Sequence, residues 1–115
     1  MLKIKIFKDK QGYIRKYTVE GHANYDAYGK DIVCAAISVL TQTALFSLVE
    51  VCGVEEDKID YFIDDITGYL DVNLPVDIDF SLLDKTEIVL KSLEVGIKSV
   101  IESYPKYVTL EYGEV

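Results

Sequence analysis

The residues best suited to chemistry in this sequence are its single histidine, His22, and one of its two cysteines, Cys34. A cysteine nucleophile needs a thiolate, a proton carrier beside the sulfur and hydrogen-bond donors for an oxyanion. His22 lies twelve residues before Cys34, and a loop of this length can fold back to bring the imidazole onto the sulfur. The pair therefore predicts nucleophilic chemistry at Cys34, with His22 as the proton carrier.

The residues around Cys34 predict a helix that holds the sulfur near its N-terminus. We expect this helix over residues 31–51, with Asp31 either as its N-cap or as a third catalytic residue that orients His22. Cys34 then falls in the first turn, where unpaired amides, its own among them, and the helix dipole stabilise a negatively charged sulfur and an oxyanion. Ser38 lies one turn further on the same helix face and is expected to reach the thiolate or its neighbours.

The second cysteine, Cys52, is interpreted as structural. If both cysteines lie on the predicted helix, the 18 residues between them, at ~1.5 Å each, separate them by ~27 Å. A disulfide needs Cα atoms within ~7 Å. Two distant cysteines and one histidine do not make a closed zinc site, and the sequence has no phosphate-loop motif. We therefore expect reduced thiols in a cytoplasmic protein without a metal or cofactor.

The composition is typical of one acidic domain over residues 1–115. The length falls within the ~100–200 residues usual for a domain, and half of the residues are apolar, enough for a core without disulfides. Twenty acidic residues against 12 basic ones give a formal charge of −8. Because nucleic acids and anionic membranes are also negative, we expect neither as a partner.

Hydrophobic periodicity predicts the element order ββαββαβ. Alternating apolar residues predict strands over residues 2–6, 13–20, 59–63, 69–74 and 107–112. Between them lie the helix described above and a second helix that runs from Ser81 to about Pro105. This order is typical of an α+β domain with both helices on one face of a mixed or antiparallel sheet.

The two helices differ in their polarity. The first contains an apolar stretch, residues 32–49, that is long enough for a membrane, but its serine, threonine and glutamine residues favour a buried helix in a soluble domain. Ser81 is expected to begin the second helix, and Glu87–Lys91 and Glu94–Lys98 form favourable pairs along it. Its buried face is predicted from Leu82, Val89, Leu93, Ile97 and Val100.

The segment from Gly21 to Ser38 resembles the signature of a known family. The matching residues are Gly21, His22, Ala23, Tyr25, Gly29, the run Asp31-Ile32-Val33-Cys34-Ala35-Ala36, and Ser38. This segment is similar to that of the bacterial ribosomal-processing cysteine proteases, the Prp family, whose members are small single-domain proteins. The resemblance implies that His22 and Cys34 form a catalytic dyad.

The resemblance also implies a substrate and an assembly. Members of the family remove a short N-terminal extension from a large-subunit ribosomal protein before that protein works in the ribosome. They are homodimers with a mobile loop over the site, which here corresponds to residues 23–30. Six further residues are expected to support the dyad or bind substrate: Gly21, Ala23, Tyr25, Gly29, Ala35 and Ser38.

The sequence leaves two other functions open. In the first, the chain is a non-enzymatic, ribosome-associated binding or regulatory module in which Cys34 is a buried structural residue. In the second, the same two residues carry out acyl transfer or redox sensing, although no resolving cysteine or cofactor motif lies near Cys34. Alkylation of the native protein distinguishes the non-enzymatic module from a protease, because a buried Cys34 resists iodoacetamide and a catalytic one reacts quickly.

Charge and apolar residues are unevenly distributed along the chain. Residues 55–84 contain ten acids and one base, whereas the first thirty residues contain seven of the twelve bases. An acidic enzyme attracts a basic ribosomal protein at long range, although such charge also simply keeps a solvated face soluble. The first helix is apolar nearly all round, so the sheet, the second helix or a second subunit has to cover each face.

Overall fold

The structure, a computed structural model, describes residues 1–21 and 30–115, and for Lys30 and Asp31 it describes the backbone only. In these residues the elements follow the order β1 (Leu2–Lys8), β2 (Ile14–Glu20), α1 (Lys30–Glu50), a 3-10 turn η1 (Glu56–Lys58), β3 (Asp60–Asp64), β4 (Tyr69–Asn73), α2 (Phe80–Ser103) and β5 (Val108–Glu114). The α+β class and the order ββαββαβ are confirmed.

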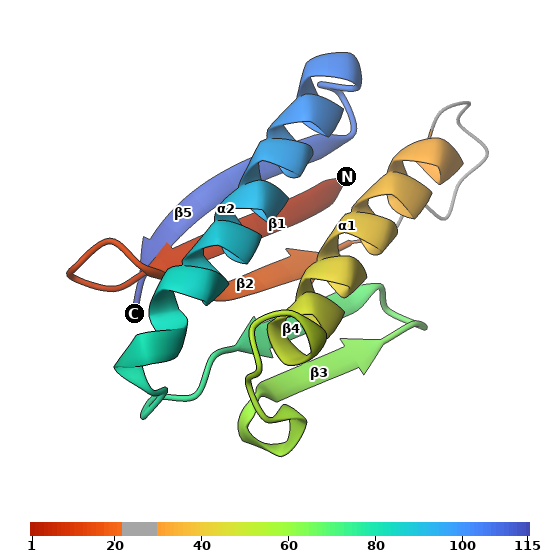
Figure 1. Ribbon diagram of the computed structural model, residues 1–115. Coiled ribbons are helices and arrows are strands. Elements are labelled where there is room, and N and C mark those ends of the chain that lie inside the picture. Colours follow the sequence, from red (N-terminus) through yellow and green to blue (C-terminus); the bar gives the residue numbers. More distant parts are fainter. Residues whose placement is uncertain (22–29) are drawn as a thin grey trace.

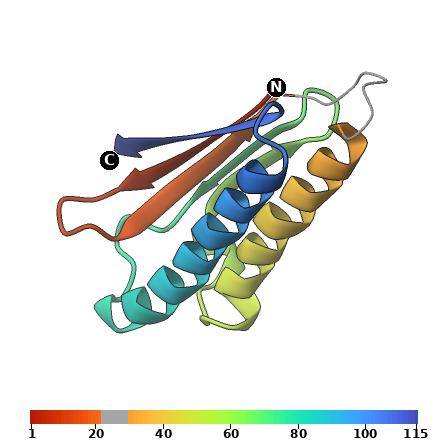
Figure 2. The same cartoon turned by 90° about the horizontal axis from the view of Figure 1, so that it is seen from above.

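The strands form one mixed sheet in the order β3-β4-β2-β1-β5. Neighbours are antiparallel except for β1 and β5, which are parallel because α2 carries the chain across the sheet between β4 and β5. Both helices cover the same face, α1 over the β4 side and α2 towards β5 (Figures 1 and 2). The predicted layering is therefore confirmed, and β3 is left at one edge of the sheet.

The turn between β1 and β2 is fixed by the side chain of Asp9. Its Oδ1 accepts hydrogen bonds from the amides of Gln11 (2.9 Å) and Tyr13 (3.0 Å), and Gly12 adopts a φ of +94°. Arg15 donates from Nε to Asp9 Oδ2 at 2.8 Å. Burial alone would raise the pKa of Asp9. These hydrogen bonds have a larger, opposite effect together, so the pKa of Asp9 lies below its ordinary value.

Helix α1 begins and ends one residue earlier than the sequence predicted. Gly53, with a φ of +81°, ends it, and the Gly53 amide donates to the Val49 carbonyl at 3.2 Å. At the other end the helix already includes Lys30. A cap lies before the first helical residue, so Asp31 is not the N-cap, and that prediction was wrong.

Helix α2 is capped by Asp79 rather than by Ser81. Asp79 Oδ1 accepts from the Ser81 amide at 2.9 Å and from Ser81 Oγ at 2.8 Å. The Ser81 amide, followed by its hydroxyl, lowers the pKa of Asp79. Both residue types favour cap positions, and the helix begins at Phe80 because the aspartate comes first in the chain.

The buried face of α2 is rotated slightly from the predicted one. Leu83, Thr86, Leu90, Leu93 and Ile97 are buried, whereas Leu82, Val89 and Val100 are only partly buried. The helix packs on both the sheet and α1, which buries a wide stripe with the predicted residues at its margin. The predicted ion pairs form, with Nζ–Oε2 distances of 4.0 Å for Lys91–Glu87 and 3.7 Å for Lys98–Glu94.

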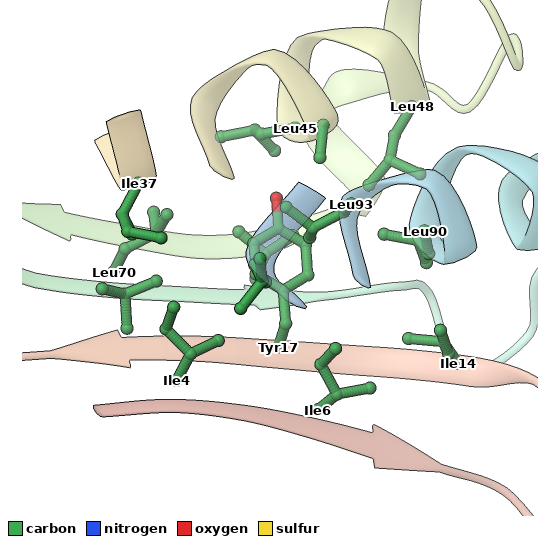
Figure 3. Packing of buried hydrophobic residues seen from close by; sticks show 14 of the residues in the cluster. Ile4, Ile6, Ile14, Tyr17, Ile37, Leu45, Leu48, Leu70, Leu90 and Leu93 are labelled. Carbon is green, nitrogen blue, oxygen red and sulfur yellow. The ribbon is translucent and has the colours of Figure 1, made fainter. Parts of the chain in front are cut away.

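Tyr17 of β2 anchors α1 on the sheet (Figure 3). Its hydroxyl donates to the Thr41 carbonyl at 2.8 Å, and Thr41 Oγ1 donates to the Ile37 carbonyl at 2.7 Å. Burial raises the pKa of Tyr17, so its hydroxyl stays a donor. Because Thr41 lies two helical turns after Cys34, this contact fixes which face of α1 carries the sulfur.

Candidate active site

The two cysteines occupy different environments. Cys34 is the fifth residue of α1 and is partly exposed, whereas Cys52 is buried beyond the end of the helix. Burial raises the pKa of the Cys52 thiol, with a smaller opposite effect of Lys85. A nucleophile has to meet substrate as a thiolate. The exposure therefore fits the prediction that Cys34 reacts and that Cys52 is structural.

Cys34 opens into a cleft of about 290 Å³ between α1 and the β3–β4 hairpin. On the α1 side the cleft is lined by Cys34, Ile37, Ser38, Thr41 and Gln42, and on the hairpin side by Ile63, Asp64, Asp65, Gly68, Tyr69 and Leu70. Leu2, Val19 and Gly21 complete it. The β3–β4 hairpin thus faces α1 across this cleft. Figure 2 shows α1 and the hairpin from above.

Two of the predicted support residues can be compared along α1. Ser38 lines the cleft with Cys34, as expected from its position one turn away. Ala35 is exposed and is not among the residues lining the cleft, because neighbouring helix residues point about 100° apart. The role of Ala35 in making room for substrate stays a prediction.

Gly21 reaches the edge of the cleft at a position where only glycine fits. Its φ is +110°, and a Cβ there would lie 2.3 Å from the carbonyl oxygen of Met1. A side chain would therefore collide with backbone that has no freedom to rotate away. Glycine at this position lets the chain leave β2 close to Met1, and the support of the site by Gly21 stays a prediction.

The start of α1 changes which amides are available to an oxyanion. Only the amides of the first helical turn lack an acceptor within the helix. Because α1 begins at Lys30, the amide of Cys34 is placed to donate to the Lys30 carbonyl. The expectation that Cys34 lies in the first turn was wrong, because the first-turn amides lie just before it. The binding of an oxyanion by the amide of Cys34 stays a prediction.

Several predicted site residues lie outside the described part of the chain. These are His22, Ala23, Tyr25 and Gly29, together with the loop over residues 23–30. The side chain of Asp31 is also outside it. The pairing of His22 with Cys34 and the contact of Asp31 with His22 therefore stay predictions.

The sequence did not reveal the hairpin that forms the opposite wall of the cleft. Asp64 Oδ1 accepts from the amides of Ile66 (2.9 Å) and Thr67 (3.3 Å), which closes the turn. Tyr69 donates to Asp71 Oδ2 at 3.0 Å, and burial, then this hydrogen bond, raise the pKa of Tyr69. The strands over residues 59–63 and 69–74 were predicted, but their place opposite Cys34 depends on pairing with distant strands.

A larger concavity, of about 870 Å³, lies elsewhere on the molecule. It is lined by residues that include Asp9, Arg15, Lys58 and Asn73. None of its lining residues is a cysteine, serine or histidine. The smaller cleft is therefore the better candidate for covalent chemistry, because it alone of the two contains a thiol.

A partly exposed thiol near the start of a helix, in a cleft on an α+β fold, fits a thiol hydrolase. A family model described as cysteine protease Prp matches residues 1–109. The ribosomal processing cysteine protease Prp of Staphylococcus aureus is 27% identical over 113 residues, covering 97% of this chain and 99% of its own. The Prp of Bacillus subtilis is 24% identical over 91 residues, covering 79% of each chain.

Solved structures share this fold. The S. aureus Prp bound to a substrate peptide has a TM-score of 0.83 at 23% identity, over 97% of this chain and 99% of its own. SMU.848 from Streptococcus mutans has a TM-score of 0.86 at 25% identity, over 100% and 96%. The chain belongs to the cysteine protease Prp family.

Family membership decides between the functions that the sequence left open. The chain is a cysteine protease, so the non-enzymatic module, which required a buried Cys34, was a wrong alternative. The family catalyses peptide-bond hydrolysis, which favours this reaction over acyl transfer and redox sensing. The resemblance seen in residues 21–38 is confirmed over nearly the whole chain.

Proposed function

We propose that this protease removes the N-terminal extension of a large-subunit ribosomal protein, using Cys34 as the nucleophile and His22 as the proton carrier. The observation that carries the proposal is the partly exposed Cys34 in a cleft of a chain matched by the Prp family over residues 1–109. The relatives in S. aureus and B. subtilis are named ribosomal processing proteases, which supports this class of substrate.

The reaction takes place in two steps. The Cys34 thiolate attacks the scissile carbonyl carbon, and first-turn amides of α1 stabilise the resulting oxyanion. The His22 imidazolium then gives its proton to the leaving amine as the C–N bond breaks, which leaves a thioester on Cys34. In the second step the neutral imidazole takes a proton from water, the hydroxide attacks the thioester, and the released carboxyl product frees the thiolate.

The proposal gives Asp31 the role of orienting His22. Asp31 lies in the first turn of α1, where a negative charge is favourable. A carboxylate beside an imidazole stabilises its protonated form and fixes the ring orientation. This arrangement would hold the imidazolium towards Cys34 before attack.

A cytoplasmic homodimer is part of the same proposal. Val39 and Ile88, at 65% and 69% exposure, line a shallow groove on the outer face of α1 and α2, an apolar surface that suits a second subunit. Helix α1 is long and apolar enough to cross a bilayer. Its inner face, however, packs in the core, with Val33 and Leu48 fully buried, as in the core helix of a soluble domain.

The test is cleavage of the ribosomal protein that carries its extension. Incubation with the purified protease is expected to give a single cut, read as the mature mass by mass spectrometry. His22→Ala is expected to lower kcat/KM by about 10²–10⁴-fold. A ribosomal protein without an extension serves as the control and should stay intact. An uncut precursor, or equal cleavage of the control, would contradict the proposed substrate.

A further inference from the structure

Strand β3 forms an exposed edge of the sheet. In residues 1–21 and 30–115 it pairs with β4 on one side and with no strand on the other. Its residues Tyr61, Phe62 and Ile63 are 39%, 57% and 40% exposed. Apolar edge strands readily accept an added strand, so proteins usually protect them. An exposed apolar edge strand next to the cleft of Cys34 suggests that another chain binds to it.

Two neighbouring hollows lie along this edge, between α1 and β3. The first is the cleft of Cys34, which includes Gln42 and Ile63. The second, of about 170 Å³, is lined by Leu45, Phe46, Val49, Glu50, Glu56 and Tyr61. Phe46 follows Gln42 by one helical turn, and Tyr61 and Ile63 lie on the same face of β3. We call the combined hollow the α1–β3 groove.

The α1–β3 groove has the length of a short extended peptide. From Cys34 to Phe46, 12 residues of α1 at ~1.5 Å each span ~18 Å. At ~3.4 Å per residue, an extended chain covers this distance with about five residues. A peptide with its scissile bond at Cys34 would therefore reach Phe46 and Tyr61.

We propose that the substrate lies in the α1–β3 groove as an additional strand paired with the edge of β3, an inference that rests on the proposed proteolytic function. The peptide backbone exchanges hydrogen bonds with β3, and every second side chain points towards α1. One of these side chains packs against Phe46, Val49 and Tyr61 in the second hollow. The strand pairing holds the peptide extended and delivers its scissile carbonyl to Cys34.

The walls of the groove indicate which residues the peptide carries. The second hollow is apolar at Leu45, Phe46 and Val49, so it suits an aliphatic or aromatic side chain. Acidic residues lie at both ends of the groove, Asp64 and Asp65 near Cys34 and Glu50 and Glu56 at the far end. The matching substrate is therefore an apolar segment flanked by lysine or arginine.

The first test uses peptides that span the cleavage site of the extended ribosomal protein, each with one N-methylated amide. Only alternate amides of an added strand face its partner strand. Binding is measured by fluorescence anisotropy on the Cys34→Ala protein, so the result does not depend on cleavage. We expect Kd to rise at least tenfold at every second position and to change little at the positions between. A uniform effect, or none, along the segment would overturn the strand pairing.

The second test compares two exposed phenylalanines. Phe46 lies in the groove at 56% exposure, whereas Phe80 begins α2 at 75% exposure and packs edge-on against Tyr13. Phe46→Ala is expected to raise the Kd of the peptide and the KM for its cleavage about tenfold with kcat unchanged. Phe80→Ala should change neither. Equal thermal melts of both variants exclude unfolding.

The outcomes separate the two proposals. Peptide cleavage by the wild type with no effect of Phe46→Ala would overturn binding in the α1–β3 groove and leave the proteolytic function standing. Absence of cleavage, together with alternate-position N-methyl effects on binding, would contradict the proposed function and support the groove.

Discussion

At the scale of single residues, Cys34 and Cys52 show how position decides the chemistry of the same side chain. Cys34 is partly exposed in a cleft near the start of α1, and Cys52 is buried with a raised pKa. Their different environments agree with the sequence prediction, which rested on Cys34 lying near a helix start and within the Prp signature. The opposite wall at Asp64 and Asp65 could not, because it depends on pairing between distant segments.

The close approach of Gly21 to Met1 leads to a prediction on stability. Gly21→Ala would place a Cβ 2.3 Å from the Met1 carbonyl oxygen at a φ of +110°. We expect the free energy of unfolding, measured in urea, to fall by more than ~2 kcal/mol. Gly12→Ala is the matched control, since its φ is +94° but no atom lies within 4 Å of the added Cβ. Equal effects of the two substitutions would argue against the steric role of Gly21.

At the scale of elements, the helices were predicted in place but not at their first residues. Asp31 and Ser81 both have the chemistry of a cap, yet α1 includes Asp31 and α2 is capped by Asp79. Residue type alone does not tell which residue precedes the first helical residue, because more than one nearby residue has the chemistry of a cap. The first helical residue is set by the backbone hydrogen bonds. The rotation of α1 was likewise not visible, because it follows from the contact of Tyr17 with the Thr41 carbonyl.

The cap of α2 gives a prediction on pH dependence. The pKa of Asp79 is lowered in the folded state by the Ser81 amide. The contribution of its carboxylate to stability is therefore present above the unfolded pKa of ~3.9 and lost as the pH falls through the lower folded value. Asp79→Ala should lower the free energy of unfolding at pH 7, and the difference from wild type should shrink towards pH 3.

Urea titrations at both pH values measure this difference. Asp79→Asn is the matched variant, because it retains a capping oxygen without titrating in this range. Ser81→Ala removes the serine hydroxyl but keeps the backbone amide, so its effect should be the smaller one. A larger loss for Ser81→Ala than for Asp79→Ala would contradict the assignment of the cap.

At the scale of the whole molecule, the layering follows from the periodicity of the sequence, but the neighbours in the sheet do not. Two helical and five strand patterns define an α+β sandwich of two layers. The order β3-β4-β2-β1-β5 depends on contacts between distant segments. That order places the acid-rich hairpin opposite Cys34 and leaves β3 at the edge, and both features shape the cleft that we propose as the substrate site.

The net charge leads to a prediction on substrate encounter. The chain carries a formal charge of −8, and charges separated by more than ~10 Å are largely screened at 0.1 M salt. For a basic ribosomal protein, kcat/KM should fall several-fold between 50 mM and 500 mM NaCl, mainly through slower association. A short uncharged peptide with the same cleavage site is the control. If kcat/KM for the ribosomal protein does not depend on salt, the negative charge does not speed association with this substrate and serves only solubility.

Cleavage by matched cysteine variants tests whether Cys34 is the nucleophile of this protease. Cys34→Ala and Cys52→Ala are incubated with the extended ribosomal protein, and the intact masses of the products are followed over time. We expect no cleavage by folded Cys34→Ala and continued cleavage by Cys52→Ala wherever that variant remains folded. Continued cleavage of the same bond by Cys34→Ala would contradict the role of Cys34 as the nucleophile.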